Sequence, residues 1–329
     1  MNFGELLPDL IFQAVLTQGY IPTGTLFPLN SYENRVYEIP VEEGFPLIAK
    51  FYRPGRWSLA ALTEEHAFLS TLKEAEVPVV APLELKESVG PKTLALTGTT
   101  ESTEKIYYAF FPKFRGKEHD EVTNDDRLWM GRTLARLHNV SQYFPIKHRL
   151  HLDPETYGYN SLDFILTQPF LPSDLKESIE STLLNALERV DSFFATKLNV
   201  IPVHGDCHPG NVLWNQDGPH LLDFDDMLVA PPVQDVWMLF NGDAAEKKKQ
   251  QEIFFEGYET FRSFDQKTLI LSEPLRTLRI IRHASWIGQR YEEPAFQRAF
   301  PYFRERRYWE EFLLDVKEQI SLLQELEWS

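Results

Sequence analysis

Apolar residues recur along the chain with two different spacings. Short apolar runs of the length typical of strands lie within residues 25–52 and 79–112, and a helical pattern at 59–75 separates them. Residues 139–171 are rich in proline, tyrosine and polar groups, so a loop is expected there. The other expected helices span residues 7–19, 124–138, 173–198, 243–262, 267–291 and 307–327. The pattern predicts an α+β chain whose second part is mainly helical.

Two apolar, β-prone runs follow one another beyond the middle of the chain, at residues 212–215 and 221–224. Residues 216–219 between them read Gln-Asp-Gly-Pro, and Asp-Gly at the tip is a strong hairpin signal. We therefore expect the loop before the hairpin and its returning strand to be held together.

The polar residues around this hairpin are those that metal-dependent phosphoryl transfer requires, in the order that protein kinases use. Asn211 can offer an amide oxygen to Mg²⁺, and Asp223 a carboxylate to the same ion or to a second one. Asp206 then faces the position of an acceptor hydroxyl. In the alternative interpretation Asp206 caps a turn and residues 223–226 are a solvated acidic run.

A cation for the α and β phosphates of ATP is expected on an N-terminal strand. Lys50 ends an apolar run that reads as a buried strand, although an edge lysine in solvent is the alternative. On the helix expected at 59–75, Glu65 lies one turn before apolar positions and can turn inward to hold Lys50. Glu64 is the competing candidate, and either glutamate could lie on the surface.

A loop that covers the phosphates should precede Lys50. Residues 28–37 lie between two expected strands but contain no glycine. Backbone amides and the Ser31 hydroxyl would have to do what a glycine-rich loop does.

These residues together resemble the aminoglycoside phosphotransferase and choline kinase branch of the protein-kinase-like fold. The residues that carry the resemblance are Lys50, Asp206, Asn211, Asp223, the stretch 134–138 and the short path from Asp223 to Asp235. Within that branch the chain is similar to the RdoA family of bacterial stress response kinases, from about residue 20 to residue 310. The motifs behind this closer similarity are residues 30–37, 50–54, 204–208, 234–239 and 241–243.

The resemblance implies a bilobal protein-kinase-like fold. A small N-terminal antiparallel-sheet lobe would comprise residues 1–112, where a strand runs into Pro112, and a larger, mainly helical C-terminal lobe would comprise residues 113–329. It also implies ATP- and Mg²⁺-dependent transfer of the γ-phosphate to serine or threonine hydroxyls of proteins, the chain itself included, in a stress response.

The same resemblance assigns roles to single residues. Asp206 and Asp223 would be catalytic, and Asn211 and Asp223 would bind Mg²⁺. Ser31 and Lys50 would contact ATP, and Glu65 would contribute to the same site through its expected contact with Lys50. Asp225 stands where protein kinases usually have the glycine of Asp-Phe-Gly, which makes a flip of Asp223 less favourable and can provide another acidic contact.

Composition restricts the partners and the location. The 329 residues carry 33 basic and 49 acidic side chains, a net charge of −16, so nucleic acid is not an expected partner. Since no apolar run reaches the length of a membrane span and the first residues do not read as a signal peptide, we expect a cytoplasmic protein without membrane contact. We expect a monomer, and Cys207, as the single cysteine, excludes an internal disulfide.

Other functions compete with a protein kinase. About twelve residues separate Asp223 from Asp235, which leaves no long activation segment as a platform for peptides and favours a small acceptor such as an amino alcohol, homoserine or an aminoglycoside. A catalytically dead binding module is a further alternative, although the set of polar residues is intact. His204, Asp206 and His208 could instead indicate a metallohydrolase with imidazole ligands.

Overall fold

The computed structural model describes residues 3, 6–98, 105–119 and 121–327. By compactness the chain divides into two units. The first comprises Met1–Arg149, His204–Met227 and Met238–Phe264, and the second comprises Leu150–Val203, Leu228–Trp237 and Asp265–Ser329. The chain passes more than once through each unit, so compactness groups the residues differently from a division after residue 112. That division into lobes remains a prediction.

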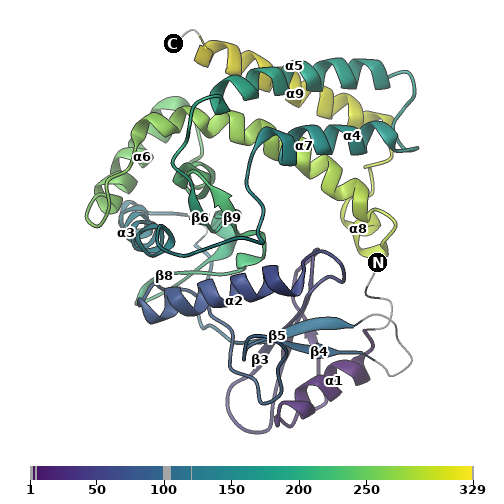
Figure 1. Ribbon diagram of the computed structural model, residues 1–329, viewed down its shortest axis with the longest axis vertical. Coiled ribbons are helices and arrows are strands. Elements are labelled where there is room, and N and C mark those ends of the chain that lie inside the picture. The colour runs from purple at the N-terminus through teal and green to yellow at the C-terminus, as the bar shows by residue number, and fades with distance from the viewer. Residues whose placement is uncertain (1–2, 4–5, 99–104, 120, 328–329) are drawn as a thin grey trace. The chain divides into compact units, whose positions relative to one another are not determined.

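A five-stranded antiparallel sheet lies in the N-terminal part of the first unit (Figure 1). Its strands, in spatial order, are β1 (Phe27–Pro28), β2 (Arg35–Ile39), β3 (Leu47–Phe51), β5 (Ile106–Pro112) and β4 (Ala95–Thr97). Lys50 lies on the central strand β3, opposite Val36 on one side and Ala109 on the other.

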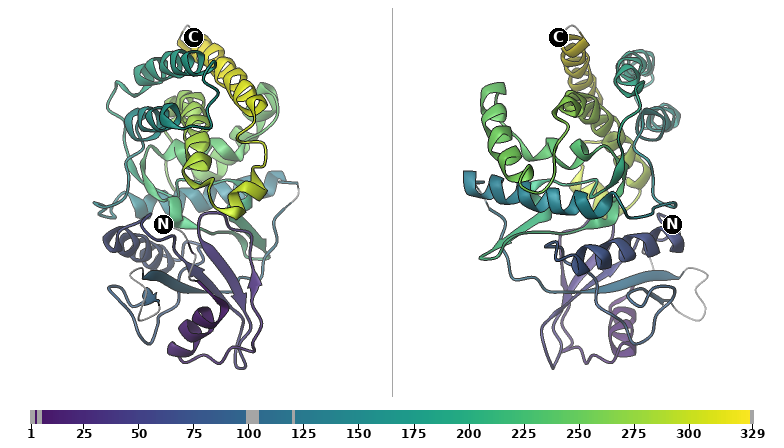
Figure 2. Two further views of the ribbon diagram at one scale, coloured as in Figure 1. Left: turned by 90° about the vertical axis from the view of Figure 1, so that its right-hand side faces the viewer. Right: turned by 60° about the vertical axis from the view of Figure 1, so that its left-hand side comes forward.

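The alternation of side chains along β3 directs Lys50 to one face of this sheet. Ala49 and Phe51 are buried with residues of helix α1 (Pro8–Thr17), whereas Tyr52 packs in a separate cluster with Leu62 of helix α2 (Leu59–Glu74). The two helices lie on opposite faces of the sheet (Figures 1 and 2). Ser58 caps α2 by accepting a hydrogen bond from the Ala61 amide, which determines where the helix begins.

The predicted hairpin is present, but its second strand is shifted. Strand β7 (Val212–Asn215) pairs with β8 (Gly218–Leu221), and Asn215 lies opposite Gly218, so the turn consists of two residues. Asp223 therefore follows the strand instead of lying on it, because β8 ends at Leu221 and residues 224–226 form a turn of 3-10 helix. The prediction that the strand spans residues 221–224 was wrong by three positions at its start.

Two helices of the first unit cross at glycines. Helix α3 (Asn124–Ser141) packs against α6 (Ala244–Tyr258), and Gly131 of α3 and Gly257 of α6 lie against the backbone of the opposite helix. Both helices begin with a capping box, at Thr123 and at Asp243.

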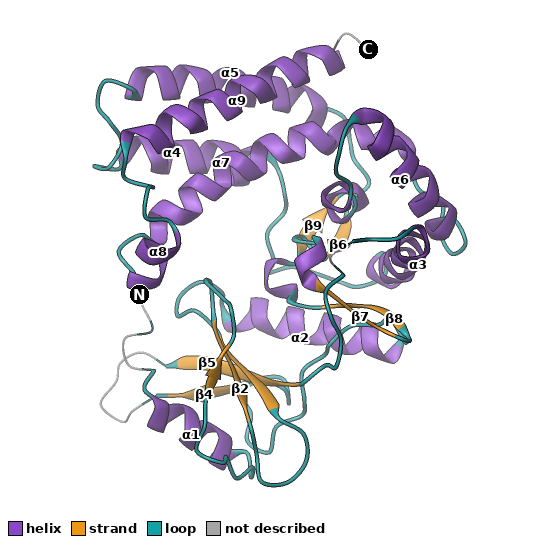
Figure 3. Ribbon diagram, turned by 180° about the vertical axis from the view of Figure 1, so that it is seen from behind, coloured by secondary structure: helices purple, strands orange, loops and turns teal. Residues whose placement is uncertain are grey.

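The second unit is mainly helical (Figure 3). Its helices are α4 (Asn160–Thr167), α5 (Lys176–Phe194), α7 (Ser272–Arg290), α8 (Pro294–Ala299) and α9 (Arg306–Glu327), and a two-stranded sheet pairs β6 (Ile201–Val203) with β9 (Leu228–Ala230). The expectation of a loop throughout residues 139–171 was wrong, since a π-helical turn (Glu155–Tyr159) and α4 form there. Helix α4 packs against α7, and its Leu162 and Ile165 are buried, which the composition of this stretch does not predict.

The antiparallel sheet followed by mainly helical structure confirms the predicted α+β class. In the part of the chain that the structure describes, no helix is both long enough and apolar enough to cross a membrane.

Candidate active site

Three segments that are distant in sequence bring ionisable groups together in the first unit. Lys50 comes from β3, Glu65 from α2, and Asp223 from the turn after β8. The Lys50 Nζ atom lies 2.8 Å from Asp223 Oδ1 and 3.8 Å from Glu65 Oε1. The interpretation of Lys50 as a solvated edge residue is excluded, because only 6% of it is exposed.

The charge of Lys50 is maintained by its carboxylate neighbours. Burial alone would lower the pKa of Lys50, but Asp223, Asp225 and Glu65 outweigh burial and hold this pKa well above its usual value. The ammonium group is therefore charged in the neutral pH range and can interact with phosphate oxygens.

Glu65, not Glu64, faces Lys50. Glu65 is 1% exposed, and its carboxylate also pairs with the fully buried guanidinium of Arg149. The Tyr52 hydroxyl lies 3.3 Å from Glu65 Oε1. Glu64 accepts hydrogen bonds from the backbone amides of residues 147–149 at 2.7–3.1 Å. The two adjacent glutamates thus hold different partners, one in the site and one in the loop that carries Arg149.

Hydrogen bonds of His204 and Asn211 connect the Asp206 loop, residues 204–211, to the segment before Asp223. His204 Nε2 lies 2.6 Å from the Leu222 carbonyl oxygen, and Nδ1 accepts the Asp206 amide at 3.3 Å. The Asn211 side-chain amide donates to the Asp206 carbonyl at 2.9 Å, and the Leu222 amide donates to the Asn211 carbonyl at 3.0 Å. Because its nitrogen is engaged in this way, Asn211 has its side-chain oxygen left as a possible metal ligand.

Asp223 combines exposure with an uncommon backbone conformation. About half of its side chain, 52%, is exposed, while Oδ1 is bound to Lys50. Its backbone is left-handed, with φ 54° and ψ 71°. A hard ion such as Mg²⁺ prefers carboxylate and amide oxygens, so the donor set of Asp223 and Asn211 fits it.

The histidines do not form a metal site. Within the described ranges, no group of three or more histidine, cysteine, aspartate or glutamate side chains could hold a metal ion. His204 uses both ring nitrogens inside the protein, and His208 Nδ1 accepts the Gly210 amide. These contacts speak against a metallohydrolase with imidazole ligands.

The segment of residues 29–34, which we call the covering loop, is held by arginines. Arg53 Nε lies 2.8 Å from Glu33 Oε1. The backbone amide of Arg53 donates a hydrogen bond to Asn34 Oδ1 at 3.1 Å. Ser31 is half-buried in this loop, and its contact with ATP remains a prediction. Ion pairs thus take over the ordering of a loop that lacks glycine.

Several residues around the site were not predicted from the sequence. Arg56 pairs with both Asp225 and Asp226, and Arg149 pairs with Glu65. His66 shares one hydrogen bond with the Tyr52 hydroxyl and one with the Thr93 hydroxyl. The one available signal was Asp225 itself, an acidic residue at a glycine position. Its Oδ1 lies 3.5 Å from Lys50 Nζ, so it does provide another acidic contact.

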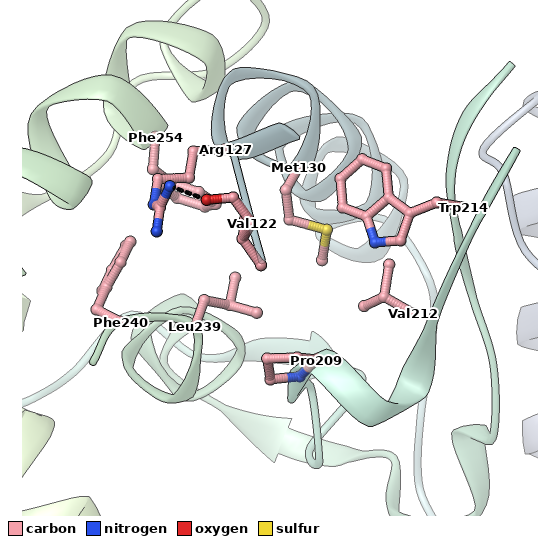
Figure 4. Close-up of a pocket in the computed structure, with 9 residues that line it drawn as sticks. All are labelled: Val122, Arg127, Met130, Pro209, Val212, Trp214, Leu239, Phe240 and Phe254. Carbon is pink, nitrogen blue, oxygen red and sulfur yellow. Dashed lines mark hydrogen bonds between the residues drawn. The ribbon is translucent and has the colours of Figure 1, made fainter. Parts of the chain in front are cut away.

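A small apolar pocket lies beside the Asp206 loop (Figure 4). Its lining residues are Val122, Arg127, Met130, Pro209, Val212, Trp214, Leu239, Phe240 and Phe254. Arg127 donates to the Val122 carbonyl oxygen there. None of the carboxylates described above lines this pocket, so it is separate from the charged site.

Comparison with known proteins defines the class to which this fold and site belong. Residues 25–267 match the profile of the phosphotransferase enzyme family. The serine/threonine protein kinase RdoA of Salmonella typhimurium strain LT2 is 36% identical over 324 residues, which cover 98% of this chain and 95% of that protein. Stress response kinase A of Escherichia coli strain K12 is also 36% identical, over 325 residues and with the same coverage. The chain belongs to the phosphotransferase enzyme family and, within it, to the group of stress response kinase A.

Solved structures of low sequence identity show the same fold. Amicoumacin kinase hAmiN, in complex with AMP-PNP, Ca²⁺ and Ami, has a TM-score of 0.74 at 17% identity, over 95% of this chain and 94% of that one. A microcompartment-associated aminopropanol kinase has a TM-score of 0.67 at 18% identity, over 95% and 96% of the two chains. The predicted protein-kinase-like fold is therefore confirmed.

Proposed function

We propose that this phosphotransferase moves the γ-phosphate of ATP to serine and threonine hydroxyls of proteins, its own chain included, with the help of Mg²⁺. The observation that carries the proposal is the convergence of Lys50, Glu65 and Asp223, beside a loop in which Asn211 and His204 hold Asp206. Relatives that match over 95% of their own length are named serine/threonine protein kinase and stress response kinase, which supports a protein acceptor.

Each side chain has a separate task in this proposal. Lys50, held by Glu65, binds phosphate oxygens, and Ser31 contacts the nucleotide from the covering loop. Asp206 orients the acceptor hydroxyl and receives its proton. Asn211 and Asp223 would hold Mg²⁺, which neutralises charge on the triphosphate when bound. Most of the acceleration then comes from positioning and electrostatic stabilisation.

A kinase for small molecules is the second candidate. The short path from Asp223 to Asp235 offers little peptide platform, and solved structures of the same fold are named for small acceptors such as aminopropanol. By either candidate we place the protein in the cytoplasm and expect a monomer that needs no phosphorylated activation loop.

The acceptor class is decided by incubation with γ-labelled ATP and Mg²⁺. One reaction contains the protein with generic protein acceptors, and another contains amino alcohols, homoserine and aminoglycosides. We expect label on protein, with phosphoserine or phosphothreonine after hydrolysis. Label on a small alcohol and none on protein would replace the first candidate by the second.

Asp206→Ala is the matched control for this assay. This variant should lower the rate of phosphoryl transfer by about 10² to 10⁴, because it removes the carboxylate that accepts the proton of the acceptor hydroxyl. Nucleotide affinity, measured by calorimetry, should stay nearly unchanged, since this residue is assigned to the acceptor. A large loss of affinity with normal turnover would contradict the assigned role.

A further inference from the structure

The segment after Asp223 is held by buried charges. Asp225 is 2% exposed, and Arg56 pairs with both Asp225 and Asp226. Arg149 donates to the Asp225 carbonyl oxygen at 2.9 Å. Lys50 Nζ also lies 3.5 Å from Asp225 Oδ1. Asp225 is therefore a buried carboxylate surrounded by three basic side chains.

The same carboxylate is connected to the covering loop by two routes. Asn34, which is 2% exposed, hydrogen-bonds to the Asp225 side chain and accepts the Arg53 amide. Arg56 provides the second route, since its Nε atom lies 3.7 Å from Glu33 Oε1. The loop expected over the phosphates and the segment that carries Asp223 thus share partners.

These shared partners matter because Asp223 has a conformation that its own backbone disfavours. A left-handed non-glycine residue persists only where the surroundings enforce it. The contacts that surround this residue are the bond of Asp223 itself to Lys50 and, two and three residues further on, those of Asp225 and Asp226 with Arg56.

We propose that Arg56 and Asp225 are positioning residues, which couple the order of the covering loop to the conformation of Asp223. Neither residue is assigned a contact with ATP or with the acceptor; both act through Asp223, Glu33 and Asn34. In this proposal the ion pair fixes Asp225 at the position of the glycine that usually follows Asp-Phe, and through Glu33 and Asn34 it also orders the covering loop, which contains no glycine. The inference rests on the proposed function only for its kinetic readout.

Hydrogen exchange of the full-length chain without nucleotide tests the coupling directly. Arg56→Met should accelerate amide exchange about tenfold or more in the covering loop, residues 29–34, and also in residues 223–227, because a buried carboxylate loses its partner. Asp225→Asn should affect the same two segments. Exchange in α3 and α6 should not change, which distinguishes local loosening from global unfolding. Arg115→Met, an exposed arginine of the same unit, is the control and should leave both segments as they are.

A milder variant decides the matter if Arg56→Met fails to fold. Arg56→Lys keeps the positive charge but cannot bridge Glu33, Asp225 and Asp226 at once. It should show the same pair of loosened segments to a smaller degree. Faster exchange in 223–227 with an unchanged covering loop, in any of these variants, would overturn the coupling.

Kinetics provide the second readout. Arg56→Met and Asp225→Asn should each lower kcat/KM for ATP about tenfold, and the double variant should be hardly worse than either single one, since both remove one unit. Fully additive losses would overturn the proposal. If the wild-type chain phosphorylates no acceptor, the proposed function fails, while the exchange result still decides the coupling.

Discussion

At the scale of single residues, the backbone of Asp223 is the most informative feature. A left-handed conformation costs a residue other than glycine about 1–3 kcal/mol. In return the carboxylate reaches Lys50 with one oxygen while half of the side chain stays exposed. A carboxylate that is anchored but accessible suits a proposed Mg²⁺ ligand.

We predict that Asp223→Asn lowers the rate of phosphoryl transfer about a hundredfold or more at saturating Mg²⁺. A neutral amide cannot stabilise the charge of the metal and triphosphate in the transition state as a carboxylate does. Initial rates with labelled ATP over a Mg²⁺ titration measure the loss. Asp217→Asn, in the exposed turn of the same hairpin, is the control. A variant that keeps more than about half of the wild-type rate would show that Asp223 is not the ligand.

At the scale of elements, helix α2 directs the side chains of two neighbouring glutamates, Glu64 and Glu65, to different partners. Successive residues of an α-helix point about 100° apart. Glu65 therefore enters the charged site, while Glu64 reaches the backbone amides of residues 147–149. The same loop carries Arg149 back to Glu65, so it fastens α2 at two adjacent positions.

We predict that Glu65→Gln lowers kcat/KM for ATP roughly tenfold, because Lys50 and Arg149 lose the charge that holds them. Glu64→Gln retains one acceptor oxygen and should lower the free energy of unfolding by only about 1 kcal/mol, with near-normal kinetics. Steady-state rates and urea unfolding of both variants make the comparison. If Glu64→Gln proves the more harmful to catalysis, the assignment of Glu65 fails.

The crossing of α3 and α6 is the second feature at this scale. A Cβ atom at Gly131 would overlap the carbonyl oxygen of Phe254 and lie 2.8 Å from the Tyr258 nitrogen. Backbone atoms of a packed helix cannot move aside as a side chain can.

We predict that Gly131→Ala lowers the free energy of unfolding by about 1–3 kcal/mol, although alanine is the better helix former. Gly288→Ala in α7 is the matched comparison, because its neighbours are the ring ends of Phe164 and Phe170, which can shift. Thermal unfolding should show the smaller loss for Gly288→Ala. Equal losses would mean that close backbone packing is not what requires glycine at Gly131.

At the scale of the whole molecule, a buried histidine links stability to pH. His66 is 1% exposed and lies between the Tyr52 hydroxyl and the Thr93 hydroxyl, at 2.8 and 2.7 Å. Burial, with Lys50 and Arg149 nearby, lowers the pKa of His66 from 6.5 to about 3. Between these two pKa values His66 is protonated in the unfolded chain but neutral in the folded chain. Its contribution to the free energy of unfolding is therefore fully present above pH 6.5 and declines as the pH falls towards 3.

We predict that His66 lowers the free energy of unfolding by about 3 kcal/mol as the pH falls from 6.5 to 4. His66→Gln should be less stable at pH 7 but should show a shallower decrease over the same interval. Urea unfolding at a series of pH values measures both quantities. His148→Gln, at an exposed position, should keep the wild-type slope. An unchanged slope in His66→Gln would contradict the assignment.

Much of this molecule was determined by the sequence itself. Local periodicity predicted α2, α3 and the long helices, because their apolar positions repeat with the helical period over many residues. The Asp-Gly turn predicted the hairpin of β7 and β8. The order of Asp206, Asn211 and Asp223 along the chain indicated phosphoryl transfer, since that chemistry requires those groups around one short loop and hairpin.

Tertiary structure alone decided the remainder. Helix α4 forms within a stretch of loop-like composition and packs against α7, and Asp223 follows β8 because the next residues form a 3-10 turn, whose Asp225 pairs with Arg56. The choice of Glu65 over Glu64, and the roles of Arg56, Arg149 and His66, depend on contacts across 14 to 170 positions of the chain. A sequence pattern indicates which residues share one face of a helix or strand. The position of a buried charged side chain instead depends on partners from several elements, which meet only when the chain is folded.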